Sequence, residues 1–402
     1  MPSVGILGAG TMGAGIAQTA ASCGWTVELM DVNEEVARKA IAGIVKRLDR
    51  LVEKGRTTAE KRDAGVERLL AATGPNCFRD CDLIIEAVIE DIDVKVAAWD
   101  PVVRASRPDA ILASNTSSLS ISEMGRRIGE PRRFVGMHFF NPVPLMPLVE
   151  VIAGDGSDPA IVARALEIPA EWGKTVVKAA DTPGFIVNRI ARGFYLEPLR
   201  MLGEGIAGVD ELDRILKTLG GFRMGPFELM DLIGIDVNWE VSNSVWRQLG
   251  EPARLTPHPI QQRLVEQKLL GRKTKRGFYS YASDPPLPAL PVERQSFELG
   301  EDVYKAVRLF NDHATEQSGS ITEQYVFART LAAIINEAAL ALDASVASQV
   351  DIDTAMKRGT NYPQGPLEWA EQIGRHSCRF MLDVLNEHAE DERFQTAEWL
   401  RL

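Results

Sequence analysis

The stretch that most constrains the fold is Gly8-Ala9-Gly10-Thr11-Met12-Gly13, which joins a short β-type run, Ser3–Leu7, to a segment of helical character, Ala14–Cys23. A strand, a glycine-rich turn and a helix in direct succession predict the first βα unit of a Rossmann-like domain. Gly8 allows the tight turn, Gly10 lets the backbone approach a pyrophosphate, and Gly13 lets the helix pack closely on the strand. The helix N-terminus would offer N–H groups and partial positive charge to the phosphates.

A second strand, Thr26–Met30, ends at Asp31, 18 residues after Gly13. A carboxylate at this position accepts hydrogen bonds from the adenosine ribose and repels a 2'-phosphate. We therefore predict that the six residues of the glycine turn and Asp31 bind NAD in preference to NADP. The alternatives are a flavin site or a purely structural Rossmann turn.

Composition narrows the class of protein. A length of 402 residues suggests two or three domains, and the formal charge of -11 disfavours partners such as nucleic acid or an anionic membrane surface. No apolar run approaches a membrane span in our reading, so we expect a cytoplasmic protein with no membrane partner. Four scattered cysteines, Cys23, Cys77, Cys81 and Cys378, argue against a disulfide scaffold and against a metal site.

Two further strand ends carry polar side chains. The apolar strand Asp82–Val88 precedes Glu90 and a helix with Lys95, and the strand Ala110–Ala113 precedes Ser114-Asn115-Thr116-Ser117-Ser118. Ligands of parallel sheets lie beyond the carboxyl ends of the strands, so these residues fall on the cofactor side. The hydroxyl groups could instead cap the helix that begins near Ile121.

The stretch Gly136–Val151 holds a histidine and a carboxylate in apolar surroundings. Phe134–Phe140 reads as a buried strand, three prolines force an extended loop, and Leu148–Ile152 reads as the returning strand. A buried carboxylate needs a partner, so Glu150 would pair with His138, fix its tautomer and stabilise the imidazolium. The alternative is a core histidine bonded to a backbone carbonyl, with Glu150 turned to solvent.

Five linked motifs then identify a family. GAGTMG, EAVIED from Glu86, SNTSSL from Ser114, GMHFFNPVPLMPLVEV and DTPGFIVNR from Asp181 follow one another in this order. The chain resembles the L-3-hydroxyacyl-CoA dehydrogenase family from Ser3 to about Tyr281. The resemblance implies NAD-dependent, reversible oxidation of a (3S)-3-hydroxyacyl-CoA thioester to 3-oxoacyl-CoA, in fatty-acid β-oxidation or related acyl-CoA metabolism.

The same resemblance implies individual roles. His138 matches the catalytic base, Glu150 its orienting carboxylate, and Ser117 and Asn188 the contacts to substrate oxygens, with Ser117 also near the nicotinamide. The positions that match NAD contacts are Glu90, Lys95, Asn141 and Lys273. Lys54 matches a lysine that meets coenzyme A, but Arg47 stands at the companion hydroxyl position. The alternative for Arg47 and Lys54 is a solvated helix face.

The C-terminal half contains a repeat. Arg223–Gly234 reappears as Pro363–Gly374 at an offset of 140 residues, and Phe185–Arg189 corresponds to Tyr325–Arg329. Val209-Asp210 matches Val350-Asp351 if a one-residue shift is allowed. We predict a duplicated helical module. The second copy has Ala328 in place of Asn188 and lacks the tail that begins at Gly271, so we expect it to be structural.

These patterns predict an α/β Rossmann-like NAD-binding domain in residues 1–181 followed by all-α domains. The helical domains would span 182–282 and 322–402, joined by a Pro-rich linker, 283–321, with a short helix at Glu301–Phe310. The second copy could take a dimer partner's place within one chain, which would form a pseudo-dimer. A homo-oligomer stays an alternative.

Two rival functions remain open at this point. Another NAD-linked β-hydroxyacid dehydrogenase would share the Rossmann half but would use a lysine after the Ser/Asn loop. A catalytically idle NAD-binding protein, like the lens crystallin of this family, would lack the intact set of four residues present here: Ser117, His138, Glu150 and Asn188. The sequence does not fix the acyl chain length.

Overall fold

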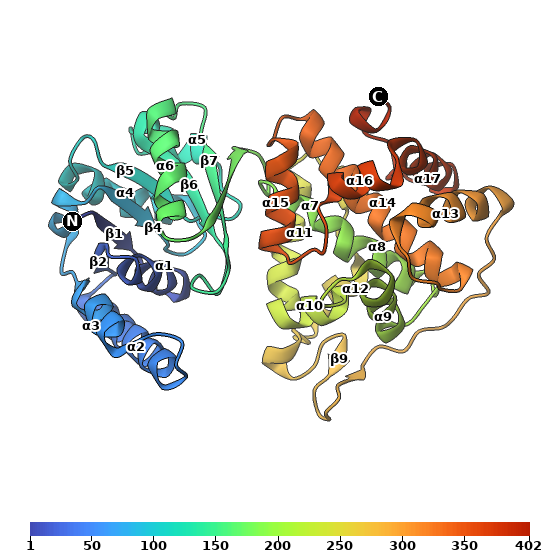
Figure 1. Ribbon diagram of the computed structural model, residues 1–402, viewed down its shortest axis with the longest axis horizontal. Helices are drawn as coiled ribbons and strands as arrows, with labels where there is room; N and C mark the ends of the chain where they lie inside the picture. Colours follow the sequence, from blue (N-terminus) through green and yellow to red (C-terminus); the bar gives the residue numbers. More distant parts are fainter. The chain divides into compact units, whose positions relative to one another are not determined.

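The computed structural model describes residues 1–402, which form two compact units, Met1–Phe185 and Ile186–Leu402 (Figure 1). We call them the sheet unit and the helical unit. The sheet unit is α/β, and the helical unit consists of helices and one two-stranded pair, β9 Tyr279–Ser280 with β10 Leu287–Pro288. The predicted fold class is confirmed.

The sheet unit is built on one eight-stranded sheet of order β3-β2-β1-β4-β5-β6-β7-β8. The first six strands of this order run parallel, β7 is antiparallel to β6, and β8 is parallel to β7. The strands are β1 Ser3–Leu7, β2 Thr26–Met30, β3 Leu69–Ala71, β4 Leu83–Glu86, β5 Ile111–Ser114, β6 Phe134–Phe139, β7 Leu148–Ala153 and β8 Thr175–Ala180.

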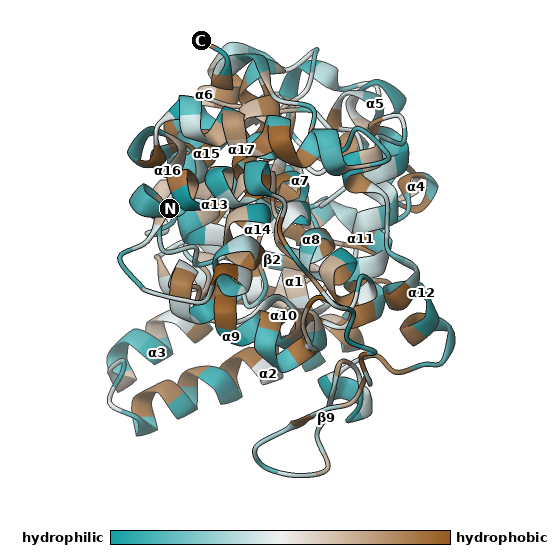
Figure 2. Ribbon diagram, turned by 90° about the vertical axis from the view of Figure 1, so that its right-hand side faces the viewer, coloured by the Kyte–Doolittle hydropathy of each residue, from teal (hydrophilic) through white to brown (hydrophobic).

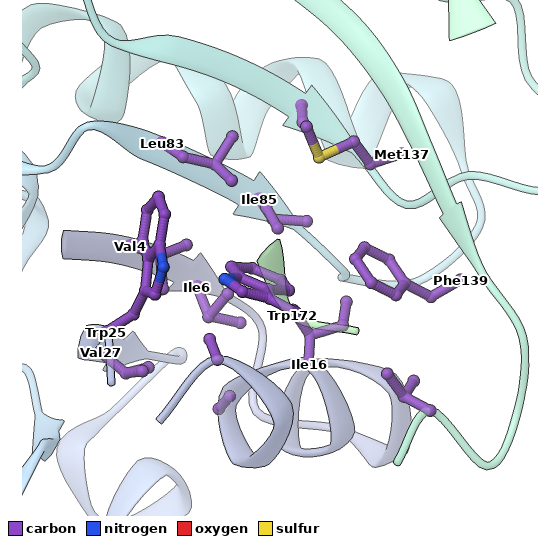
Figure 3. Close-up of a cluster of buried hydrophobic side chains, with 14 of the residues drawn as sticks. Val4, Ile6, Ile16, Trp25, Val27, Leu83, Ile85, Met137, Phe139 and Trp172 are labelled. Atoms are coloured by element: carbon purple, nitrogen blue, oxygen red, sulfur yellow. The ribbon is translucent and has the colours of Figure 1, made fainter. Parts of the chain in front are cut away.

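Helices and an apolar core support this sheet. The helices are α1 Thr11–Ser22, α2 Glu34–Glu53, α3 Ala59–Glu67, α4 Ile92–Ala105, α5 Ile121–Arg127 and α6 Pro159–Glu171, with short helical turns η1 Pro75–Asp80 and η2 Pro131–Arg133. Aliphatic side chains of β1 and β4 pack with Trp25, Phe139 and Trp172 in one core cluster (Figure 3). Figure 2 shows apolar and polar segments alternating along α2, as a half-buried helix requires.

The helical unit contains eleven helices. They are α7 Val187–Ile190, α8 Arg192–Gly203, α9 Val209–Gly220, α10 Pro226–Ile233, α11 Ile235–Gln248, α12 Pro259–Glu266, α13 Glu301–Ala314, α14 Ile321–Asp343, α15 Gln349–Gly359, α16 Pro366–Ile373 and α17 Arg375–His388, with turns η3 Ala253–Leu255, η4 Arg272–Thr274 and η5 Glu398–Leu400. Within the predicted linker, α13 extends beyond the expected end at Phe310 and packs against α14 and α17.

The expectation that no segment approaches a membrane span is wrong for α14. This helix is long and apolar enough to cross a membrane by length and composition alone. However, 83% of its most apolar 18-residue window is buried inside the protein. The apolar character of α14 is therefore that of a central core helix, with its side chains covered by its neighbours.

The two copies of the helical module superpose in register at a constant offset. Asp213 accepts a hydrogen bond from the Phe227 N–H at 2.9 Å, and its counterpart Asp353 accepts one from the Leu367 N–H at 2.8 Å. Helices α9 and α15 begin 140 residues apart, as do α10 and α16. The one-residue shift that we inferred from Val209-Asp210 is therefore wrong.

Contacts between the copies come in exchanged pairs. Arg189 Nε lies 2.6 Å from Glu337 Oε1, and Arg329 Nε lies 2.8 Å from Glu197 Oε2. Arg329 is the counterpart of Arg189 at the 140-residue offset, and Glu337 is the counterpart of Glu197. Each copy thus gives its arginine to the other's glutamate, which is the pattern of a two-fold interface.

Candidate active site

His138 and Glu150 face each other across the antiparallel strands β6 and β7, where they are direct register partners. The ring Nδ1 lies 2.7 Å from Glu150 Oε2, with side-chain exposures of 8% and 0%. Cross-strand partners point to the same face of a sheet, which explains why the pair meets. The alternative of a solvent-facing Glu150 is wrong.

Burial gives this pair its chemistry. A carboxylate removed from water needs a charge-assisted donor, and the Nδ1–H of His138 supplies it. The rings of Phe140 and Phe185 lie 4.4 Å and 6.0 Å from the imidazole centroid. With Nδ1 engaged as a donor, the other ring nitrogen, Nε2, is the atom that can take a proton from a ligand.

The glycine turn has the shape that a pyrophosphate needs. Gly8 has a φ of 105°, and a Cβ there would lie 2.6 Å from the Ala87 carbonyl oxygen. A Cβ on Gly13 would collide with the carbonyl oxygen of Gly8. A Cβ on Gly10, in contrast, would meet no atom within 4 Å. Two glycines therefore serve the packing of the protein, and the third faces open space that a phosphate group of NAD can approach.

Asp31 is fixed at the edge of this turn. Its Oδ2 accepts a hydrogen bond from the Ala9 N–H at 2.6 Å, and its Oδ1 accepts one from the Val32 N–H at 2.7 Å. A carboxylate has about four acceptor positions, so two further hydrogen bonds from ribose hydroxyls can be accommodated. The turn and the acid together fit NAD.

A buried charge network lies at the ends of β4 and β5. Glu86 is fully buried, and it accepts hydrogen bonds from Lys95 Nζ at 2.6 Å and from Ser114 Oγ at 2.6 Å. Lys95, which is 1% exposed, also lies 3.3 Å from Glu90. Sequence reasoning missed the role of Glu86, although a carboxylate at the end of an apolar strand was the available signal.

Glu90 in turn holds the serine loop. Its Oε1 accepts hydrogen bonds from Thr116 Oγ1 at 2.7 Å and from the Ser117 N–H at 2.9 Å. Burial alone would raise the pKa of Glu90, but the Lys95 ammonium and these hydrogen bonds outweigh burial and lower it. The α5 helix is capped by Ser120, so the alternative that the 114–118 hydroxyls form the cap is wrong.

Two side chains that the sequence did not single out tie the loops to the His138 strand. Asn115 Oδ1 accepts a hydrogen bond from the Phe139 N–H at 2.9 Å. Lys174 Nζ donates to the carbonyl oxygens of Val143 and Met146, at 2.5 Å and 2.8 Å, and so holds the loop that begins with Asn141. No local sequence signal points to Lys174, because its partners lie about 30 residues away.

The remaining predicted residues are placed as follows. Arg47 donates to Gln18 Oε1 at 2.7 Å, and Lys54 is the exposed C-cap of α2. Asn188 and Lys273 belong to the helical unit. Lys273 Nζ binds both carboxylate oxygens of Asp236, at 2.5 Å and 2.6 Å.

A Rossmann sheet with an acid at the end of β2 and a buried histidine–carboxylate pair define a nicotinamide-dependent dehydrogenase. The family model described as 3-hydroxyacyl-CoA dehydrogenase, NAD binding domain, matches residues 3–182. The model described as 3-hydroxyacyl-CoA dehydrogenase, C-terminal domain, matches residues 184–281 and 325–402. The chain belongs to the 3-hydroxyacyl-CoA dehydrogenase family and is an NAD-dependent oxidoreductase acting on an acyl-CoA substrate.

Known relatives agree over the whole chain. It is 37% identical to a 3-hydroxyadipyl-CoA dehydrogenase of Escherichia coli, covering 99% of this chain and 96% of that protein. It is 39% identical to a 3-hydroxybutyryl-CoA dehydrogenase of Bradyrhizobium diazoefficiens over 71% of this chain and 97% of that one. A crystal structure of a 3-hydroxybutyryl-CoA dehydrogenase of Escherichia coli matches with a TM-score of 0.88 and 35% identity, covering 100% of this chain and 97% of that chain.

Proposed function

We propose that this dehydrogenase acts on short (3S)-3-hydroxyacyl-CoA thioesters and that His138 is its general base. The observation that carries the proposal is the 2.7 Å contact between His138 Nδ1 and the fully buried Glu150. His138 Nε2 would accept the proton of the 3-hydroxyl group, and Glu150 would stabilise the imidazolium that forms. Bound NAD supplies the acceptor for the hydride that leaves C3.

Other residues would position the reactants. Ser117 and Asn188 are proposed to bind substrate oxygens, which keeps C3 aligned for transfer. Asn141, Lys273 and Glu90 are proposed contacts to NAD. Lys95 is 1% exposed, so we propose that it contributes to NAD binding through Glu90. Lys54, on the exposed end of α2, is a proposed contact for coenzyme A.

The proposed chain length rests on the named relatives. The full-length relative is named for a six-carbon dicarboxylic acyl group and the others for a four-carbon group. The test is oxidation of NADH, followed by its near-ultraviolet absorbance, with acetoacetyl-CoA, 3-oxoadipyl-CoA and a long-chain 3-oxoacyl-CoA, with NADPH in parallel. Turnover of only the long-chain substrate would refute the short-chain proposal.

The test of the base is His138→Gln. Loss of a general base should lower turnover by roughly 100- to 10,000-fold while NADH still binds. Near-normal turnover in this variant would remove His138 from the mechanism. If the wild-type chain binds NADH but turns over no 3-oxoacyl-CoA, the idle NAD-binding protein or another β-hydroxyacid dehydrogenase would be favoured.

We also propose a cytoplasmic location and a monomeric chain in which the second helical copy replaces a dimer partner. All four cysteines are free thiols, which fits a reducing compartment. The exchanged arginine–glutamate pairs between the copies support the pseudo-dimer. Fractionation of the source cells tests the location, and sedimentation tests the oligomeric state.

A further inference from the structure

The helix that carries Asn188 cannot orient itself. Helix α7 spans four residues, Val187–Ile190, and has no side-chain cap. One turn of helix has too few internal hydrogen bonds to be stable by itself. Its direction is therefore set by what holds the residues on either side of Asn188.

The second helical copy supplies one of these holds. Arg189, next to Asn188, is buried, and its Nε lies 2.6 Å from Glu337 Oε1 on α14. The other oxygen of Glu337 lies 2.6 Å from Arg254 Nε, and only 3% of the Glu337 side chain is exposed. One buried carboxylate thus binds two guanidinium groups, and α7 also packs against α14 and α15.

The first copy supplies the opposite hold. Arg192 Nε donates to the backbone carbonyl of Asn188 at 2.9 Å, and Arg192 also donates to Ser242 Oγ on α11 at 2.8 Å. Asn188 is thereby fixed through its own carbonyl by the first copy and through the next residue by the second.

We propose that Glu337 is a positioning residue of the active site and that the second copy, although it carries Ala328 in place of Asn188, takes part in catalysis through it. This inference rests on the proposed role of Asn188 in binding a substrate oxygen. Glu337 never touches the substrate. It fixes Arg189, which fixes the turn of helix that presents the Asn188 amide.

The internal repeat offers a matched control. The reciprocal contact joins Glu197 to Arg329, at 2.8 Å, and both side chains are 3% exposed. Arg329 follows Ala328, which has no polar group to offer a substrate. Glu197→Gln therefore breaks an equivalent buried pair whose arginine adjoins no predicted substrate contact.

The experiment compares Glu337→Gln, Glu197→Gln and Asn188→Ala in the full chain, with acetoacetyl-CoA and NADH as probes. We expect Glu337→Gln to lower kcat/KM for acetoacetyl-CoA by roughly 10- to 100-fold, the scale of an ångström-level misplacement. The dissociation constant for NADH should stay within about two-fold of the wild type, because NADH binds the sheet unit. Glu197→Gln should lower the melting temperature as much as Glu337→Gln and leave kcat/KM within about two-fold.

Equal losses of kcat/KM in the two glutamine variants would overturn the inference, because both would then reflect general loosening of the fold. If Glu337→Gln does not fold, Glu337→Asp keeps the charge, shortens its reach by one methylene, and is expected to lower kcat/KM in the same direction. Full activity in Glu337→Asp would overturn the inference too. If Asn188→Ala keeps wild-type activity, the proposed role of Asn188 fails. If Asn188→Ala is impaired and Glu337→Gln is not, the inference alone fails.

Discussion

At the scale of single residues, Glu150 decides which nitrogen of His138 can accept a proton. Glu150 is fully buried and acts only as an acceptor toward Nδ1. In Glu150→Gln the new amide can donate to Nδ1, which would place the proton on Nε2 and block it as a base. We expect kcat to fall by roughly 100- to 10,000-fold, as when the carboxylate of a histidine–carboxylate pair is replaced by its amide.

Steady-state kinetics and NADH binding check this prediction. Affinity for NADH should not change, because the glycine turn and Asp31 are untouched. Glu150→Asp, which keeps the charge, serves as the control and should lose less activity than Glu150→Gln. Equal activity of Glu150→Gln and the wild type would show that the pair has no part in proton transfer.

Asp31 should decide between NAD and NADP. Its two oxygens accept hydrogen bonds from the Ala9 and Val32 N–H groups, so Asp31→Asn keeps one acceptor for the turn and loses the negative charge. We expect KM for NADH to rise and the preference over NADPH to fall by roughly ten-fold or more, since about 1.4 kcal/mol corresponds to a factor of ten. The ratio of kcat/KM for the two cofactors is the measurement. An unchanged ratio would mean that Asp31 does not face the ribose.

How far single residues could be predicted from sequence depended on the distance to their partners. His138 and Glu150 are 12 residues apart on two strands joined by one loop, so their pairing follows from local pattern. Arg189 and Glu337 are 148 residues apart, and their pairing depends on how two helical copies pack. The repeat was visible in the sequence, but which charged side chains it brings together was not.

At the scale of elements, periodicity worked where apolar residues were buried and failed where they were few. The strands at Ser3–Leu7 and Thr26–Met30 have the predicted bounds, because their apolar residues face a core on either side of the sheet. The charged segment after Lys54 was predicted only as a polar stretch. It forms α3, which buries little apolar surface and begins at the cap residue Thr58.

The start of α12 should make stability depend on pH. His258 is the N-cap of α12, and its Nδ1 accepts a hydrogen bond from the Ile260 N–H at 3.3 Å, which requires a neutral ring. Burial, followed by the guanidinium groups of Arg200 and Arg263, lowers the pKa of His258 to about 4, against smaller opposing effects of the carboxylates of Glu204 and Glu197. The folded chain therefore binds fewer protons here than the unfolded chain, and this contribution to stability is lost as the pH falls from about 6.5 toward 4.

His258→Asn keeps a capping acceptor and removes the titration. Between pH 7.5 and pH 5 the free energy of unfolding of the variant should fall by roughly 1 to 2 kcal/mol less than that of the wild type. Asp213, whose pKa burial raises to about 7, acts in the opposite direction in both proteins, so the difference between them isolates His258. Denaturant unfolding at the two pH values provides the measurement, and parallel curves would contradict the assignment.

At the scale of the whole molecule, the helical unit is a two-fold interface closed within one chain. Arg329 lies 2.8 Å from Glu197 and binds Glu204 through its other nitrogens, at 2.6 Å and 2.8 Å. Buried charges of this kind are costly when one partner is removed, by roughly 3 to 5 kcal/mol. The first copy is therefore not expected to stay folded as an isolated monomer with Arg189 and Glu197 unpaired.

A second copy of the same module could satisfy those charges. Because Glu337 is the counterpart of Glu197 and Arg329 that of Arg189, two chains truncated after Tyr281 could pair Arg189 of each with the partner's Glu197. We expect the full chain to sediment as a monomer and the truncated chain, residues 1–281, to sediment as a dimer. Glu197→Gln should weaken that dimer and leave the full chain monomeric. A full-length dimer that dissociates on mutation of the same face would show that the second copy does not occupy the partner's place.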